Sequence, residues 1–364
     1  MSDAGVTLQV QVRLGSSAAC LAGRLADALR SHLASGYPTG VALAVIDRTG
    51  AALAAWGGQA CIVGRHVPMR RDTLFDLASL TKVVAAVPLA LTLEQRGLWR
   101  LSDPVAAWVP EFPRSDTTLW HLLTHTSGLV PHRPFFATAR GRQAIQHAVC
   151  LEARESGPGE TVVYSDLNFM LLGWAIEQCA GMRLDRLFQR AVAEPLGMSR
   201  SGFRPAGRPS VRVAATELDG DQRTRSGLVW GSVHDGNAFA LGGIAGHAGL
   251  FAPLDDLVSF VRPLLDPATH PVLSVASIAA MTRQQAGMQP DVRALGWGLA
   301  PLHWGAWPDT TYWHTGFTGT SLLVSPERGL GVALLMNGVH PTRRPDEQKV
   351  ARADIHAIIA EACS

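Results

Sequence analysis

The stretch FDLASLTKVV, residues 75–84, opens an apolar run that extends to Leu93 and predicts a helix beginning at Ser79. In that helix Lys82 would lie three residues after Ser79 on the same face, so its amine could meet the serine hydroxyl. The free backbone N–H groups of a helix start also favour negative charge near Ser79. Because serine is a poor nucleophile without a neighbouring base, Ser79 is a candidate nucleophile with Lys82 as its partner. The alternative is an N-cap serine followed by a surface lysine.

The use of lysine favours the catalytic interpretation. Of 32 basic residues, 30 are arginine, and only Lys82 and Lys349 are lysine. A lysine can lose its proton when its surroundings lower its pKa, whereas an arginine cannot. The apolar residues 83–87 offer such surroundings, so the lysine at position 82 indicates a requirement for a group that can release a proton.

A tyrosine precedes a second apolar helical segment, NFMLLGWAIEQCAG, at residues 168–181. The phenol of Tyr164 can carry a proton where nearby positive charge stabilises the phenolate. The alternative is that Ser165 or Asp166 caps this helix while Tyr164 packs beside it, and both interpretations can hold together.

The stretch WHTGFTGT, residues 313–320, leads into the strands near the C-terminus. Gly316 and Gly319 allow a ligand to approach the strand backbone closely. A backbone N–H in this stretch could join that of Ser79 in holding an oxyanion, an interaction worth on the order of 3 kcal/mol per donor. The alternative is a bulge at a strand edge with an incidental histidine, His314.

Strands are predicted at both ends of the chain and helices in the middle. Helical spacing covers residues 17–33 and 346–362, and two β-hairpins are predicted at residues 41–57 and 320–339. The predicted fold is α/β (α+β): an antiparallel sheet flanked by the terminal helices, with an inserted, mainly helical subdomain. The sheet part is expected at about 17–82 and 301–364 and the helical subdomain at about 83–300. Because the sheet pieces lie far apart in sequence, one domain is expected over residues 1–364.

Composition and charge exclude several classes of protein. The net charge is +2 without a basic run, which argues against a nucleic-acid partner and against a membrane-surface helix. The five cysteines are widely spaced without a CxxC pair, so neither a disulfide framework nor a zinc site is expected. No P-loop and no G-x-G-x-x-G occurs, and no metal or cofactor is expected. The N-terminus lacks a signal-peptide pattern and no apolar stretch is long enough to span a membrane, so a cytoplasmic location is expected.

Together the motifs resemble those of the serine β-lactamase and penicillin-binding-protein-like family, on its class C and esterase side. They occur in the same order: Ser79-x-x-Lys82, Tyr164-Ser165-Asp166 and His314-Thr315-Gly316. Supporting stretches lie at residues 122–129, 195–198, 243–251 and 296–298, and the resemblance covers about residues 20–360.

The resemblance implies a β-lactamase/transpeptidase-like fold and an acyl-enzyme mechanism. Ser79 would attack a carbonyl carbon, while Lys82 and Tyr164 would share the general-base and general-acid roles. The backbone N–H groups of Ser79 and Phe317 would form the oxyanion hole, and water or another acceptor would release the acyl group. Which of the two side chains takes the first proton is open, because they titrate as a coupled pair. The aromatic residues beside the last motif, Tyr312 and Trp313, are candidates for a pocket lining.

Two departures from the family pattern bear on activity. Asp166 stands where β-lactamases commonly carry Asn, and a carboxylate near Lys82 favours the protonated amine, which makes Tyr164 the base. His314 stands where class C β-lactamases usually carry Lys, and a mostly neutral histidine weakens the anchor for a carboxylate. The second departure argues against strong β-lactamase activity.

Three further features have less specific interpretations. His121 and His125 have a spacing that can bind zinc, but without a third ligand a structural role for the 122–129 stretch is favoured. His247 lies in a Gly-rich turn expected to pack under the site, with a role as catalytic base as the minor alternative. The polar segment from residue 216 to residue 238 either borders the cleft or is a solvated loop.

The predicted function is a cofactor-independent serine hydrolase acting on a small ester or amide. Esterase is favoured because His314 weakens the carboxylate anchor and a cytoplasmic setting lacks cell-wall polymer. The alternatives are a D-amino-acid peptidase or D,D-carboxypeptidase, a weak β-lactamase, an acyltransferase, and a non-catalytic penicillin-binding sensor or scaffold. The partner is a small molecule, and the oligomeric state is open.

Overall fold

The computed structural model describes residues 8–13, 16–205, 212–218, 226–288, 291–301 and 303–363. Two segments named in the sequence analysis lie partly outside the described residues. They are the N-terminal stretch that lacks a signal-peptide pattern (residues 1–7) and the polar 216–238 segment (residues 219–225).

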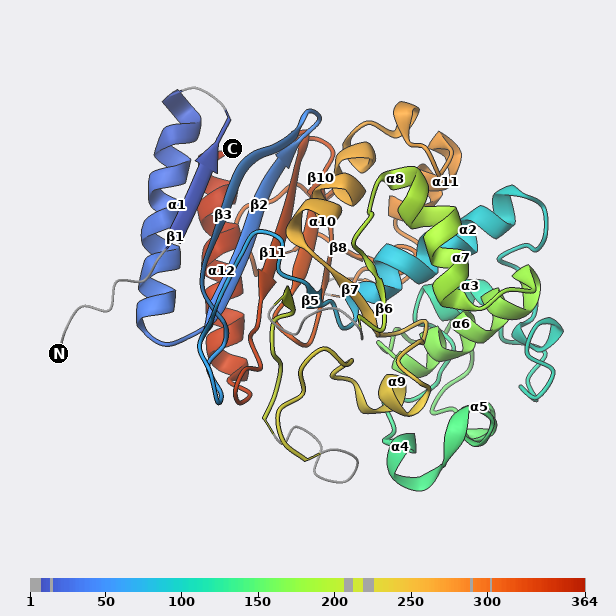
Figure 1. Cartoon of the computed structure of the whole chain (residues 1–364). Helices are drawn as coiled ribbons and strands as arrows, with labels where there is room; N and C mark the ends of the chain where they lie inside the picture. Colours follow the sequence, from blue (N-terminus) through green and yellow to red (C-terminus); the bar gives the residue numbers. More distant parts are fainter. Residues whose placement is uncertain are drawn as a thin grey trace.

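An antiparallel sheet forms the centre of the structure (Figure 1). Its strands follow the order β1 (Leu8–Val12), β3 (Gly50–Cys61), β2 (Gly40–Asp47), β11 (Leu330–Met336), β10 (Ser321–Ser325), β9 (Tyr312–Thr315) and β8 (Gly298–Leu299), and β4 (Val67–Pro68) pairs with β3. Both predicted hairpins are confirmed, and they meet where β2 pairs with β11. These two strands carry runs of Val, Leu, Ile and Ala because both faces of the sheet are covered there.

The sheet extends beyond the predicted ranges at both ends. β1 precedes residue 17 and pairs with β3, and β8 precedes residue 301 and pairs with β9. The alternating pattern LQVQV of β1 is a strand signal that the sequence interpretation missed. The division of the chain into one domain with an inserted subdomain stays a prediction.

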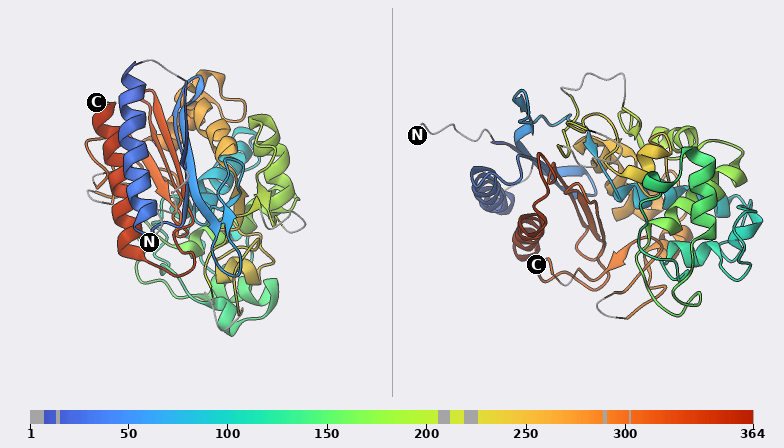
Figure 2. Two further views of the ribbon diagram at one scale, coloured as in Figure 1. Left: turned by 60° about the vertical axis from the view of Figure 1, so that its left-hand side comes forward. Right: turned by 90° about the horizontal axis from the view of Figure 1, so that it is seen from below.

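The terminal helices α1 (Ser16–Ala34) and α12 (Pro345–Ala362) cover one face of the sheet, as predicted (Figure 2). Leu25 and Leu29 of α1 are one turn apart, and so are Ile355 and Ile359 of α12, so each pair forms an apolar stripe. All four side chains are buried in one core together with alternate residues of the sheet.

The second face of the sheet is covered by the helical part of the molecule (Figure 1). Its long central helices, α2 (Val87–Gln95) and α6 (Asp166–Ala180), are apolar almost all round because both are buried. The other α-helices are α3 (Leu119–Leu123), α4 (Phe135–Thr138), α5 (Gly141–Leu151), α7 (Leu184–Phe188), α8 (Glu194–Leu196), α9 (Gly236–Ala240), α10 (Leu254–Val261) and α11 (Val275–Thr282). A small sheet of β5 (Phe75–Asp76), β7 (Leu250–Ala252) and β6 (Gly202–Phe203) lies between the two parts.

The helix predicted to begin at Ser79 begins one residue later, at Leu80. Its next turn is π-helical, η1 (Lys82–Ala86), and continues into α2. Ser79 itself lies in a tight turn after Ala78, whose φ of 46° is in the left-handed region. A π-helical turn and a strained residue at one place are features that concentrate at functional sites.

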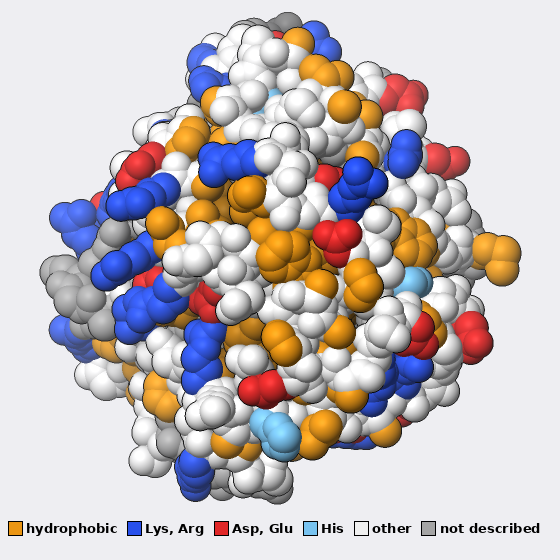
Figure 3. Space-filling model, turned by 90° about the vertical axis from the view of Figure 1, so that its right-hand side faces the viewer, with side chains coloured by type: hydrophobic (Ala, Val, Ile, Leu, Met, Phe, Trp, Pro, Cys, Tyr) orange, Lys and Arg blue, Asp and Glu red, His pale blue; other side chains and the backbone are white. Residues whose placement is uncertain are grey.

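Figure 3 shows the face formed by the helical part, where apolar side chains occur in small groups among charged and neutral ones. Within the described ranges, every helix is either too short or too polar to cross a membrane. The expectations of a cytoplasmic location and of no nucleic-acid partner stay predictions.

Candidate active site

The turn that carries Ser79 is held in place by the buried carboxylate of Asp76. Asp76 accepts hydrogen bonds from the backbone N–H of Ala78 (2.9 Å) and of His234 (2.6 Å). These bonds stabilise the left-handed conformation of Ala78, so that Ser79 projects into the space between the sheet and the helical part.

Lys82 is fully buried and touches Ser79. Its Nζ donates to Ser79 Oγ (2.9 Å), Asp166 Oδ1 (2.8 Å) and the carbonyl oxygen of His247 (3.4 Å). Three acceptors match the three N–H donors of an ammonium group. The structure therefore brings Ser79, Lys82 and Asp166 together, with Lys82 hydrogen-bonded as a cation.

The charges of Lys82 and Asp166 argue against the prediction that Lys82 can lose its proton easily. They support the prediction that the two side chains form an ion pair. Burial alone would lower the pKa of Lys82, but Asp166 and Tyr164 outweigh it and raise that pKa above its ordinary value. Burial alone would raise the pKa of Asp166, but Lys82 and His132 hold it well below its usual range. Lys82 is thus not a group that readily releases its proton. Asp166, the carboxylate that stands where β-lactamases commonly carry Asn, stabilises the protonated form of Lys82. The expected Lys82⁺–Asp166⁻ pair is present.

Tyr164 lies over the Lys82 amine, half-buried at the start of α6. The Lys82 Nζ is 4.8 Å from the centre of the phenol ring, and the guanidinium carbon of Arg293 is 5.6 Å from it. Two cations thus lie against the ring of Tyr164, so the surroundings of this side chain are positively charged. The sequence interpretation missed Arg293, because it lies 129 positions from Tyr164 in a loop without a motif.

His125 has the structural role that was favoured for it. Its buried ring lies 4.5 Å from the Tyr164 ring, and its Nδ1 accepts a hydrogen bond from the Ser165 backbone N–H (3.1 Å). It thereby fixes the backbone beside Tyr164. His121 caps α3 through Thr118, and the described ranges hold no cluster of three His, Cys, Asp or Glu placed for a metal ion.

The end of β9 forms the opposite side of the site. His314 is buried there, its Nδ1–H donates to the Thr315 carbonyl oxygen (2.9 Å), and burial lowers its pKa to about 3. It is therefore uncharged at neutral pH and does not line the pocket. Thr315, Gly316 and Phe317 do line it.

The backbone of Gly316 passes close to the turn that carries Ser79. A Cβ at this position would lie 2.5 Å from the carbonyl oxygen of Leu77 and closer still to Thr320 Oγ1. No hydrogen bond within the described residues uses the backbone N–H of Ser79 or of Phe317. Both amides are thus available to a ligand in the pocket, as an oxyanion hole requires.

Replacing Gly316 with Ala is expected to lower kcat by about 10²-fold or more, because β9 must move away from Leu77 and carry the Phe317 amide with it. Steady-state kinetics with a p-nitrophenyl ester would measure this. The matched control is Gly23→Ala on α1, where an added Cβ meets open space. Equal kcat values for both variants would refute the close approach.

The pocket around Ser79 has a volume of about 640 Å³. Its lining residues are Ala78, Ser79, His132, Phe136, Tyr164, Asp166, His234, Asp235, Gly236, His247, Ala248, Thr315, Gly316, Phe317, Arg343, Gln348 and Arg352. Neither Tyr312 nor Trp313 is among them, which corrects that prediction. Side chains alternate along β9, so Tyr312 is directed into the core, whereas Trp313 packs on Trp304 in a neighbouring hollow.

The described part of the polar 216–238 segment borders the cleft. Glu217 binds His234 Nε2 (2.9 Å) and Arg343 Nε (2.7 Å). The His234 ring stacks on the Phe317 ring at 5.5 Å, and the Arg343 guanidinium lies 5.0 Å from the same ring. Glu217 thus holds two side chains against Phe317, the residue that carries the candidate oxyanion amide.

Two arginines at the pocket were missed by the sequence interpretation. Arg352 on α12 is buried and donates to the carbonyl oxygens of Gly316 and Thr320 (3.4 Å each). Burial lowers its pKa to about 10, so it stays charged at neutral pH. Arg343, just before α12, is half-exposed at the rim. Only the packing of α12 beside β9 brings these cations to the site.

The sheet with its terminal helices, the helical part and the Ser79–Lys82 contact between them together define the β-lactamase/transpeptidase fold, a fold of serine hydrolases. The chain belongs to the β-lactamase family, whose profile matches residues 25–357.

Individual relatives agree with this membership. The chain is 29% identical over 344 residues to an Escherichia coli (strain K12) protein named "Putative D-alanyl-D-alanine carboxypeptidase", covering 84% of this chain and 79% of that one. The structure of EstCE1, described as a hydrolase with promiscuous acyltransferase activity, superposes with a TM-score of 0.73 at 22% identity (92% of this chain, 98% of that one). A class C β-lactamase from Rhodobacter sphaeroides gives 0.72 at 20% identity (93% and 99%).

Proposed function

We propose that this chain hydrolyses a small ester or amide through an acyl-enzyme on Ser79. The observation that carries the proposal is the contact of 2.9 Å between Ser79 Oγ and Lys82 Nζ, in a pocket that Tyr164 and two free backbone amides also line. A nucleophile, a proton carrier and oxyanion donors facing one cavity are the parts that acyl transfer requires.

In the proposed mechanism Tyr164 is the base. Lys82 donates a hydrogen bond to Ser79 Oγ, so the serine's own hydrogen is directed away from Lys82. With Tyr164 deprotonated, as this role requires, that proton passes to the Tyr164 oxygen as Oγ attacks the carbonyl carbon. The N–H groups of Ser79 and Phe317 stabilise the oxyanion. Tyr164 then gives the proton to the leaving group, and an ester on Ser79 results. Water attacks this ester by the same steps and restores the free serine.

The charges of the pocket bear on the substrate. The preference for an esterase relied on the weak anchor at His314, but the buried cation of Arg352 lies near the same strand end, together with Arg343, which is paired with Glu217 at the rim. These arginines favour a second candidate, a D,D-carboxypeptidase, whose leaving group is an amino acid with a free carboxylate. The name of the Escherichia coli relatives agrees with this candidate. Esterase and carboxypeptidase activities share the Ser79 acyl-enzyme.

Intact-protein mass spectrometry tests the acyl-enzyme. Brief exposure to a short-chain p-nitrophenyl ester, to D-alanyl-p-nitroanilide and to a penicillin is expected to add one acyl group to the wild type and none to Ser79→Ala. The adduct should fade as product accumulates, because water releases it. Unchanged ester turnover in Ser79→Ala would refute the proposal, and a persistent penicillin adduct without turnover would favour the sensor alternative.

A further inference from the structure

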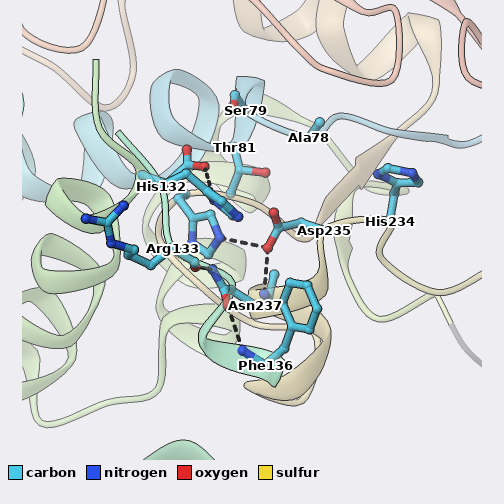
Figure 4. A network of polar contacts seen from close by, with 12 residues as sticks. Ala78, Ser79, Thr81, His132, Arg133, Phe136, His234, Asp235 and Asn237 are labelled. Atoms are coloured by element: carbon cyan, nitrogen blue, oxygen red, sulfur yellow. Dashed lines mark hydrogen bonds and ion pairs between the residues drawn. The ribbon is translucent and has the colours of Figure 1, made fainter. Parts of the chain in front are cut away.

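Asp235 occupies the pocket wall beside the Lys82–Asp166 pair and has no part in the proposed mechanism. It caps α9, and its Oδ1 accepts hydrogen bonds from the Ala238 backbone N–H (2.7 Å) and from His247 Nε2 (2.9 Å). No hydrogen bond among the described residues reaches its Oδ2. In Figure 4 one oxygen of Asp235 carries both dashed contacts, and the other points toward the side of the view where Ser79 lies.

Among the described residues the carboxylate of Asp235 has one ion-pair partner, His247, whose Nε2 lies 2.9 Å from Oδ1. His247 contacts Oδ1 only, so Oδ2 of Asp235 stays open to the pocket that Asp235 lines. The neighbouring carboxylate of Asp166 already pairs with Lys82 (2.8 Å).

The other groups that face Asp235 are bonded elsewhere and leave its Oδ2 without a hydrogen bond among the described residues. Asp76 is a buried carboxylate bonded to backbone N–H groups, and His132 is hydrogen-bonded to Asp166 (3.4 Å). His234 points away to Glu217. Asp235 is thus a carboxylate at the pocket wall with one oxygen open to a ligand.

An aromatic ring lies beside this carboxylate. Gly236 has no Cβ, and one added there would lie 2.6 Å from the ring carbons of Phe136. Asn237 fixes the ring's segment, because it accepts from the Phe136 backbone N–H (3.1 Å) and donates to the Arg133 carbonyl oxygen (2.8 Å) (Figure 4). A carboxylate oxygen and an aromatic ring that line one pocket suit an organic ammonium group.

Arg343 and Arg352 line the same cavity beside Phe317 and Gly316, whereas Asp235 lines it at the start of α9. If the arginines receive a leaving group with a carboxylate, the acyl part of the substrate lies at the Asp235 end.

We propose that Asp235 binds a protonated amine on the acyl part of the substrate, flanked by Phe136. The preferred acyl donors are then aminoacyl esters or amides with a free amino group. This inference rests on the proposed function of Ser79 and names the substrate class of the same site.

The test compares three kinds of p-nitroanilide on the wild type: alanyl, in its D and L forms, with a free amine; N-acetyl-alanyl, with the amine blocked; and propionyl, without the amine. The wild type is expected to prefer the free amine by about 10- to 100-fold in kcat/KM. The preference should fall as the pH rises through the amine's pKa of about 8, because only the ammonium form is bound.

Asp235→Asn is the decisive variant, because Asn keeps an oxygen for Ala238 and His247 and removes only the charge. It is expected to lose most of the preference through KM, while turnover of the propionyl compound changes by less than about threefold. The ratio is taken within each variant, so partial loss of folded protein cancels. The control is Asp309→Asn, an exposed carboxylate far from this network in sequence.

Two failures are distinguishable. Turnover without an amine preference, or a preference that survives in Asp235→Asn, would overturn the role of Asp235 and leave the Ser79 mechanism standing. Absence of both turnover and a Ser79 adduct with every probe would overturn the proposed function itself, and the amine site with it.

Discussion

Replacing Ser79 with Ala or Lys82 with Arg is expected to lower kcat/KM by about 10³- to 10⁴-fold, and the double variant to be no slower than Ser79→Ala alone. The two side chains act as one unit, because Lys82 orients the Ser79 hydroxyl and serves no purpose without it. Arginine keeps the charge opposite Asp166. Its planar guanidinium cannot direct N–H groups at both Ser79 Oγ and the His247 carbonyl from the same buried volume.

Steady-state kinetics of the four proteins on one p-nitrophenyl ester would measure this cycle. Lys349→Arg is the matched control, since Lys349 is the chain's other lysine and is exposed on α12. It is expected to change the rate by less than about twofold. If the double variant lost kcat/KM by the product of the two single losses, Ser79 and Lys82 would act independently. That result would contradict the mechanism.

Much of the fold could be predicted from the sequence because its signals are local. The hairpin around residues 47–50 has apolar runs on both sides of a Gly-containing turn, and the terminal helices show apolar stripes, so each is determined by its own segment. The short strand β8 has two residues, and no periodicity can be recognised over such a length. It exists because β9 provides a partner with free backbone groups.

The candidate site also contains residues that could be predicted from the sequence and residues that could not. Ser79, Lys82, Tyr164 and Asp166 lie in motifs at helix starts, where the order of motifs in the chain predicts that they meet. Tyr312 was misplaced because side chains alternate along β9, which directs it away from the face of Thr315. Trp313 shares the face of Thr315, but it packs on Trp304 in the neighbouring hollow.

The charged residues of the pocket could not be predicted from the sequence, for a different reason. Arg343, Arg352 and Asp235 carry no motif that relates them to Ser79. They reach it only through the packing of α12 beside β9 and of the α9 segment beside the helical part. A single sequence does not specify such long-range packing, and the substrate class depends on it.

Replacing Asp166 with Asn is expected to lower the free energy of unfolding by about 3 kcal/mol at pH 7, because it leaves the fully buried ammonium of Lys82 without its counterion. The loss should depend on pH. The pKa of Asp166 is depressed in the folded protein, so its stabilisation is present above its ordinary pKa of 3.8 and is lost as the pH falls toward the folded-state value. The gap between wild type and variant should therefore narrow below about pH 4.

Urea unfolding at several pH values from 7 down to 3 would measure that gap. The informative control is the double variant Lys82→Met, Asp166→Asn, which removes the buried charge as well and should recover most of the lost stability, although it is inactive. If Asp166→Asn were as stable as the wild type at pH 7, or if the double variant recovered nothing, the ion pair would not hold Lys82 as a cation. The Asp166 carboxylate would then give no reason to choose Tyr164 over Lys82 as the base, so the choice of Tyr164 in the proposed mechanism depends on this stability measurement.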